Sequence, residues 1–122
     1  MNPYQQKLDD MLSHTFIDMN KVASQEVKIT FTYPTKSFVC SLCDYVQYYF
    51  SNEPILLELE SPITTVGDLH GNYLDLIRII QVCGHPSETK YLFLGDIVDR
   101  GEFSFETVLL IFLMKICYPT NI

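Results

Sequence analysis

Two stretches of the sequence decide the fold: ITTVGDLHG at residues 63–71 and YLFLGDIVDRG at residues 91–101. Each begins with residues typical of a short strand and ends in an acidic loop bounded by glycines. A helical pattern follows each stretch, over residues 72–83 and 104–117. Strands that alternate with helices predict parallel pairing, so we expect an α/β layer fold. The unbroken apolar run 91–94 is typical of a strand covered on both faces.

The first half of the chain carries weaker signals. Residues 4–17 predict a short helix, and residues 27–33 alternate between apolar and polar as a short strand or an extended segment would. Residues 35–53 predict a longer helix, which ends before a proline. Its expected buried face, at helical spacing, consists of Val39, Leu42, Cys43, Val46, Tyr49 and Phe50.

The pattern changes at Pro54, after which an apolar run 55–57 begins the alternation of strands and helices. We therefore divide the chain into a helical amino-terminal segment, 1–53, and an α/β segment, 54–122. The run 108–114 is apolar around the whole helix, which is typical of burial on all sides. A helix after a parallel strand normally returns the chain to another strand. With nothing in the chain to cover this helix, we expect it to be exposed and the sequence to stop within a larger domain.

Composition narrows the class of protein. The 122 residues suffice for one domain and carry a formal charge of −7, with no basic cluster. We therefore expect neither a nucleic-acid partner nor attachment to an anionic membrane. The content of 48% apolar, 13% aromatic and 19% charged residues also excludes a disordered chain.

The amino-terminal residues and the cysteines predict the cellular compartment of the protein. The opening MNPYQQKLDD lacks the apolar core of a signal peptide, and no apolar run is long enough to span a bilayer. We expect a cytoplasmic or nuclear protein with reduced cysteines. Cys40 and Cys43 form a C-S-L-C motif that could bind zinc or act in redox chemistry. Because a second ligand pair at similar spacing is absent, we favour small buried apolar side chains on a helix.

The first acidic loop, GDLHG, lies where a predicted strand ends and a helix begins, which is where ligands bind in open α/β sheets. Residues two apart in extended backbone point to the same side, so Asp68 and His70 can bind one metal ion. Gly67 and Gly71 are expected to permit a tight turn and a close approach that side chains would block.

The second acidic loop, GDIVDRG, begins at Gly95 and ends at Gly101. If the two strands are neighbours, Asp96 lies beside the first loop, and its two carboxylate oxygens can bridge two divalent ions. Arg100 offers a planar, permanently charged group for a phosphate. Taken singly, each residue also has a simpler interpretation: an aspartate can cap a helix, and Asp99 can pair with Arg100. Capping alone does not account for two such loops on consecutive strands.

The two motifs together resemble the phosphoprotein phosphatase family of metal-dependent serine/threonine phosphatases, within the calcineurin-like metallophosphoesterases. The segment PILLELESP at residues 54–62, the run YLFLGD at 91–96 and the continuation GEFSFET at 101–107 are also similar. The resemblance implies a β-sandwich flanked by helices in a four-layer αββα arrangement. It further implies hydrolysis of phosphoserine and phosphothreonine by two divalent metals, typically manganese, iron or zinc.

Roles for individual residues follow from the same resemblance. Asp68 and His70 would bind the first metal, and Asp96 would bridge both. Asp99 would orient a catalytic histidine that protonates the leaving oxygen, and Arg100 would hold the substrate phosphate. Phosphoproteins would be the substrates and regulatory subunits possible partners.

The third motif of the family, G-N-H-E, does not occur in the sequence. It would supply an asparagine ligand of the second metal and the catalytic histidine, so we expect little or no activity from the isolated chain. Two other hypotheses stay open. The same motifs occur in metallophosphoesterases that cleave dinucleoside polyphosphates, and the chain could be a non-catalytic module that binds partners of phosphatases.

Overall fold

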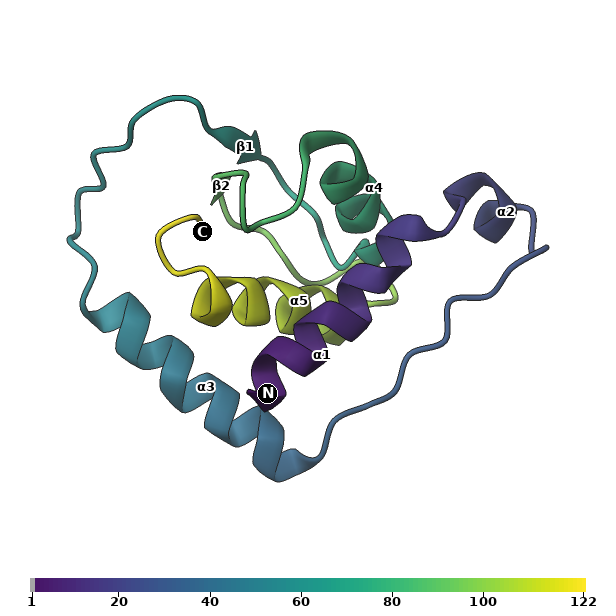
Figure 1. The fold of residues 1–122 in the computed structure, drawn as a ribbon, viewed down its shortest axis with the longest axis horizontal. Helices are drawn as coiled ribbons and strands as arrows, with labels where there is room; N and C mark the ends of the chain where they lie inside the picture. Colours follow the sequence, from purple (N-terminus) through teal and green to yellow (C-terminus); the bar gives the residue numbers. More distant parts are fainter. Residues whose placement is uncertain (1) are drawn as a thin grey trace.

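The computed structural model describes residues 2–122 and shows a mixed fold of helices and a small sheet (Figure 1). Helix α5 lies in the middle, α1 crosses it, α3 runs along one side, and the strands with α4 lie on the other. The elements are α1 (Pro3–Leu12), the 3₁₀ helix η1 (Ser13–Phe16), α2 (Met19–Ala23), α3 (Lys36–Ser51), β1 (Thr64–Val66), α4 (Tyr73–Cys83), β2 (Tyr91–Phe93) and α5 (Ser104–Cys117). The four predicted helices are confirmed, the first of them ending in the 3₁₀ turn.

Local capping signals explain where the helices begin. The Thr35 side chain accepts a hydrogen bond from the Phe38 amide at 3.2 Å, and so begins α3 directly after a proline. The Asn72 side chain accepts a bond from the Asp75 amide at 3.1 Å at the start of α4. Each cap satisfies an amide that has no partner within its own helix.

The two strands form a parallel sheet, as predicted. Thr64 pairs with Tyr91, Thr65 with Leu92 and Val66 with Phe93. The prediction that residues 91–94 are covered on both faces is wrong, because Leu94 lies beyond the end of β2 and is 64% exposed. Only Tyr91 of this run is fully buried.

The prediction that α5 is exposed is also wrong. Helices α1, α3 and α4 all pack against it, and most of its residues are buried, although Phe105 is exposed and Val108 and Phe112 on the same face are half-buried. Its apolar side chains meet those of the amino-terminal helices in one cluster that includes Leu8, Met11, Leu42, Val46, Leu110, Leu113 and Met114. Burying one such side chain stabilises the fold by about 1.5–3 kcal/mol. The amino-terminal helices therefore bury most of the apolar surface of α5, which the sequence pattern predicted to be buried.

Two charged residues lie within this buried helix, and both have partners. Glu106 accepts a hydrogen bond from the Tyr33 hydroxyl at 2.6 Å. The Lys115 ammonium forms an ion pair with Glu53 and donates to the carbonyl oxygen of Ile122 at 2.7 Å. Among the described residues, no buried side-chain polar atom lacks a hydrogen bond. Pairing offsets the large penalty for burying a charge, so these residues are compatible with an otherwise apolar helix.

The segment 27–33 is extended but forms no strand within residues 2–122. Its alternation is nevertheless real, because Ile29 and Phe31 pack against the core. No neighbouring strand pairs with this backbone, and side chains of η1 and α1 hold it instead. The Lys7 ammonium, for example, donates to the Thr32 carbonyl oxygen at 2.6 Å. Alternation therefore correctly marked a half-buried extended segment but not a sheet.

Two further expectations for the first half of the chain are wrong. Cys40 and Cys43 are exposed, because α3 buries only a narrow stripe that consists of Leu42 and Val46. Residues 55–57 form neither helix nor strand and are exposed. The division of the chain at residue 54 stays a prediction.

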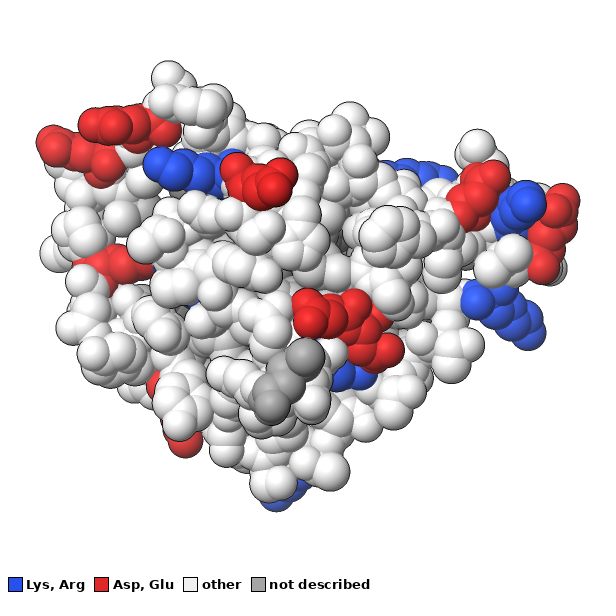
Figure 2. All heavy atoms as spheres, viewed as in Figure 1, with Lys and Arg blue, Asp and Glu red and all other residues white. Residues whose placement is uncertain are grey.

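The surface carries charged residues in small groups. On the face that Figure 2 shows, Lys and Arg are few and scattered rather than gathered in one patch. Across residues 2–122, no helix combines the length and the apolar character that crossing a bilayer requires.

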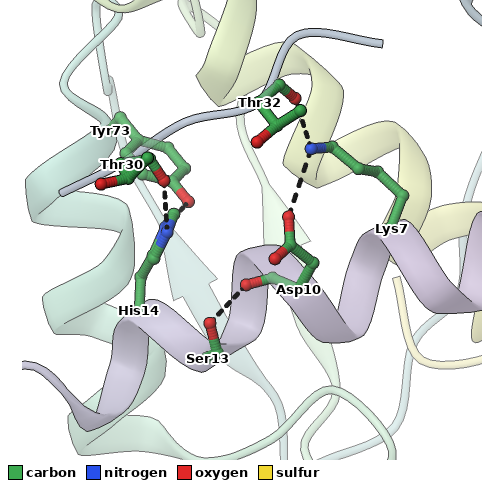
Figure 3. Close-up of polar contacts among 7 residues, drawn as sticks. All are labelled: Lys7, Asp10, Ser13, His14, Thr30, Thr32 and Tyr73. Atoms are coloured by element: carbon green, nitrogen blue, oxygen red, sulfur yellow. Dashed lines mark hydrogen bonds and ion pairs between the residues drawn. The ribbon is translucent and has the colours of Figure 1, made fainter.

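A buried histidine joins η1, the extended segment and α4 (Figure 3). His14 is 7% exposed, with Nδ1 2.7 Å from the Tyr73 hydroxyl and Nε2 3.2 Å from the Thr30 carbonyl oxygen. Since a carbonyl oxygen can only accept, Nε2 carries the proton and Nδ1 accepts from Tyr73. Burial lowers the pKa of His14, against the smaller opposing effects of the Thr30 carbonyl and Asp10.

The lowered pKa of His14 predicts that acid destabilises the fold. The unfolded chain takes up a proton at His14 near pH 6.5, whereas the folded chain resists it. The free energy of unfolding should therefore be constant above about pH 7.5 and fall as the pH drops through about 6.5. His14→Gln should be less stable at high pH by about 1–3 kcal/mol, with a flatter pH profile. Urea unfolding between pH 5 and 8 measures both.

His85→Gln is the control, because His85 is exposed. It should keep the wild-type pH profile. An identical slope in wild type and His14→Gln would contradict the prediction.

Candidate metal centre

The two acidic loops leave the sheet at the same end. Parallel register pairs Val66 with Phe93, and the Leu94 amide continues the ladder by donating to the Val66 carbonyl oxygen at 3.0 Å. The loops at residues 67–71 and 95–101 therefore start side by side. In an α/β sheet, this is the edge at which ligands bind.

Backbone hydrogen bonds join the two loops directly. The amides of Leu69 and His70 both donate to the Asp96 carbonyl oxygen, at 3.0 and 2.9 Å, and the Gly71 amide donates to Ile97 at 2.7 Å. In the opposite direction, the Gly101 amide donates to the His70 carbonyl oxygen at 2.7 Å. The loops thus form one rigid unit rather than two independent turns.

Unusual backbone conformations concentrate in this unit. His70, Asp96, Asp99 and Arg100 have φ values of +46°, +49°, +67° and +73°, in the left-handed region. Each non-glycine residue in this region reduces the stability of the fold by on the order of 1 kcal/mol, because its Cβ crowds the backbone. Within residues 2–122, Gln25 is the only other non-glycine residue with positive φ. Strain of this kind persists where the surrounding contacts enforce it and is typical of functional sites.

Two glycines make the close contact between the loops possible. A Cβ on Gly101 would lie 2.3 Å from the His70 carbonyl oxygen, and one on Gly71 would lie 2.7 Å from the Ser104 hydroxyl. The expected close approach is therefore present at Gly71, which also has a φ of +70°. It is absent at Gly67, where a Cβ meets nothing within 4 Å. The expectation that Gly67 is required for steric reasons is wrong.

The loops bring together the three side chains that were predicted to bind metal. Asp68, His70 and Asp96 each offer a ligand atom, and these atoms lie within 4.8 Å of one another. His70 Nε2 lies 3.5 Å from Asp68 Oδ2. Both carboxylates are exposed and the imidazole is half-buried, so the cluster opens to solvent.

A comparison with known protein families identifies the fold to which this cluster belongs. The model of the calcineurin-like phosphoesterases matches residues 61–122, just over half of the chain. The chain belongs to this family. The matched residues contain both strands, both acidic loops and α5, and the small parallel sheet is compatible with part of the α/β fold of a metallophosphoesterase.

The cluster of this calcineurin-like phosphoesterase fits a divalent metal ion. Two carboxylates and one imidazole are donors that suit zinc, iron and manganese. His70 Nδ1 donates to the Val98 carbonyl oxygen at 3.3 Å, so Nε2, which faces Asp68, is the nitrogen available to bind a metal ion. Metal-binding histidines commonly use a carbonyl oxygen in this way to fix the tautomer. Sequence reasoning missed Val98, because a main-chain carbonyl leaves no signal in the residue type.

The number of ligands limits what the cluster can hold. Three side chains satisfy one ion whose remaining positions are left to water or substrate, as in catalytic metal sites. A second ion would need ligands beyond these three, and residues 2–122 contain no other such group of histidine, cysteine and acidic side chains. A divalent ion bound here supplies Lewis-acid chemistry for a phosphoryl oxygen.

Asp99 and Arg100 lie in the second loop and are exposed. Within residues 2–122 no ion pair joins them, so the simpler interpretation of a mutual salt bridge finds no support. Gly101 follows them directly, and its amide donates to the His70 carbonyl oxygen, which anchors the end of the Asp99–Arg100 turn to the first acidic loop. The assigned roles of both residues stay predictions.

The contact at Gly101 predicts a strong effect of a single methyl group. Gly101→Ala should destabilise the fold by about 1–3 kcal/mol, because the added Cβ meets main-chain atoms that cannot move freely. Gly67→Ala is the matched control and should change the free energy of unfolding by less than about 0.5 kcal/mol. Urea unfolding measures both, and equal effects of the two variants would refute the steric argument.

Metal binding should depend on the three-residue cluster. We expect one Mn²⁺ ion per chain in calorimetric titration. Asp96→Asn should raise the Kd for Mn²⁺ at least about tenfold, because changing even a residue that only hydrogen-bonds to a metal ligand weakens metal binding by that factor. Asp44→Asn removes an exposed carboxylate from α3 and should leave the Kd unchanged. Equal losses in the two variants would indicate non-specific binding to an acidic surface.

Proposed function

We propose that this chain binds a phosphate ester at the metal centre and acts in the hydrolysis of phosphoserine and phosphothreonine in proteins. One observation carries the proposal: the hydrogen bond from the Gly101 amide to the His70 carbonyl oxygen holds the backbone that follows Arg100 against the loop of the candidate metal cluster. A divalent cation and an arginine at one site together complement a phosphate dianion, which needs several oxygens neutralised at once.

Each residue of the site has a specific task under this proposal. Asp68, His70 and Asp96 bind the metal, and the Val98 carbonyl orients the His70 ring. Arg100 donates in parallel to two phosphate oxygens, which sets the phosphorus atom next to the cluster. Asp99 orients an imidazole that protonates the leaving oxygen. Within residues 2–122 the Asp99 carboxylate has no hydrogen-bonded partner, so this role requires a histidine from elsewhere.

The wider family resemblance supports the choice of substrate. The residues that precede β1 and those that begin α5 are similar to protein phosphatases rather than to enzymes that cleave dinucleoside polyphosphates. The proposed fold is the corresponding four-layer β-sandwich flanked by helices, with manganese, iron or zinc as the metal. Phosphoproteins are the proposed substrates, and regulatory subunits the proposed partners, in the cytoplasm or nucleus.

Substrate binding and turnover test the proposal together. The Mn²⁺-loaded chain should bind a phosphothreonine peptide more tightly than diadenosine tetraphosphate. It should release phosphate from the peptide only slowly. Two metal ions can hold both the attacking and the leaving oxygen, whereas a single ion cannot hold both. Asp96→Asn should abolish both the binding and the release.

Each alternative has its own signature in the same assays. Tighter binding of diadenosine tetraphosphate would indicate that the substrate is a dinucleoside polyphosphate rather than a phosphoprotein. Absence of binding to both compounds, in a chain that unfolds cooperatively, would favour a non-catalytic binding module.

A further inference from the structure

The first residue of α5 makes an unusual use of its hydroxyl group. Ser104 Oγ accepts a hydrogen bond from the Asp99 amide at 3.0 Å. It does not cap its own helix, since the N-cap residue is Phe103, which makes no side-chain capping bond. A serine at the start of a helix ordinarily satisfies the helix's own amides. Here the hydroxyl is committed to the second acidic loop instead.

The bond from Asp99 lies at one end of a strained pair of residues. Asp99 and Arg100 are consecutive and both left-handed, with φ values of +67° and +73°. Such a pair is unfavourable for residues other than glycine and reverts to other conformations unless contacts hold it. The Asp99 amide is bound to Ser104 before the pair, and the Gly101 amide is bound to His70 after it. The two hydrogen bonds therefore bracket the turn that carries Arg100.

Ser104 also lies against the first acidic loop. A Cβ on Gly71 would stand 2.7 Å from Ser104 Oγ and 3.1 Å from the Ser104 amide nitrogen, and the Phe103 amide donates to the Gly71 carbonyl oxygen at 3.1 Å. The hydroxyl thus sits between the loop of His70 and the loop of Arg100. A larger side chain at position 71 would displace it.

We propose that Ser104 is a positioning residue that holds the Asp99–Arg100 turn, and so sets Arg100 for a phosphate at the metal centre. The inference rests on the proposed function of Arg100. The helix that is most deeply buried in the fold thereby fixes an exposed phosphate-binding group through one hydroxyl. Removing that hydroxyl frees the turn without touching any of the three metal-binding side chains.

Orthophosphate binding to the Mn²⁺-loaded chain tests the proposal. Ser104→Ala should weaken phosphate binding about tenfold, the effect of losing roughly one hydrogen bond, and leave the Kd for Mn²⁺ unchanged. Hydrogen exchange of the Asp99 amide, followed by NMR, should accelerate by a similar factor. Ser37→Ala is the matched control, since Ser37 lies in the first turn of α3, away from the loops. It should change neither phosphate binding nor the exchange of the Asp99 amide.

A double-variant comparison shows whether Ser104 acts through Arg100. Arg100→Ala should lose phosphate binding, and adding Ser104→Ala should then cause no further loss. A loss that persists in the Arg100→Ala background, or wild-type phosphate affinity in Ser104→Ala, would overturn the inference. If Ser104→Ala fails to fold, Ser104→Cys keeps the volume with a weaker acceptor and should show intermediate phosphate affinity.

Failure of the proposed function is distinguishable in the same data. If Arg100→Ala binds phosphate as tightly as wild type, Arg100 does not bind the phosphate. Exchange of the Asp99 amide then decides separately whether Ser104 holds the turn, and an unchanged rate in Ser104→Ala would refute that as well.

Discussion

The Asp96 carbonyl oxygen accepts the amides of both Leu69 and His70, and the arrangement of the site depends on this shared acceptor. It joins the loop after β1 to the loop after β2 at the point where each carries a side chain of the candidate metal centre. Because the two donors are consecutive, the peptide between Leu69 and His70 has a fixed orientation. His70, which follows this peptide, and Asp96, which accepts from it, both have positive φ. The strained backbone and the convergence of the carboxylates with the imidazole thus occur at the same contact between the loops.

Much of this arrangement could be predicted from residue types. Parallel strands that each end in Gly-Asp predict that Asp68, His70 and Asp96 meet, and the structure brings their ligand atoms within 4.8 Å. Side-chain chemistry and strand register suffice for that prediction. The contributions of Val98 and Ser104 could not be predicted, because one acts through a carbonyl that every residue possesses and the other through a bond that depends on two left-handed residues. The steric roles of the glycines also needed coordinates, since Gly67 and Gly101 look alike in sequence and differ in their surroundings.

The errors in the first half of the chain have a different physical origin. Periodicity reports which side of an element is apolar but not which element lies opposite. Residues 27–33 alternate as a strand does, yet their neighbours are the side chains of His14 and Lys7 rather than another strand. Cys43 falls on the apolar side of α3, but the contact with α5 is too narrow to reach it. The apolar circumference of α5 correctly predicted that most of the helix is buried, but Phe105 is exposed, and the source of the cover was misjudged.

The packing of α1 on α5 has a consequence for the order in which the protein acquires structure. These helices occupy opposite ends of the sequence, and the Gln5 side chain donates to the Tyr118 hydroxyl across a separation of 113 residues. Contacts of such long range are slow to form, because the intervening chain must first be confined. During synthesis, the apolar faces of α1 and α3 emerge well before α5, so they stay without this partner until residues 104–117 have been translated. Until then the apolar faces of α1 and α3 are exposed to solvent, which is the state of a folding chain that is most prone to aggregation.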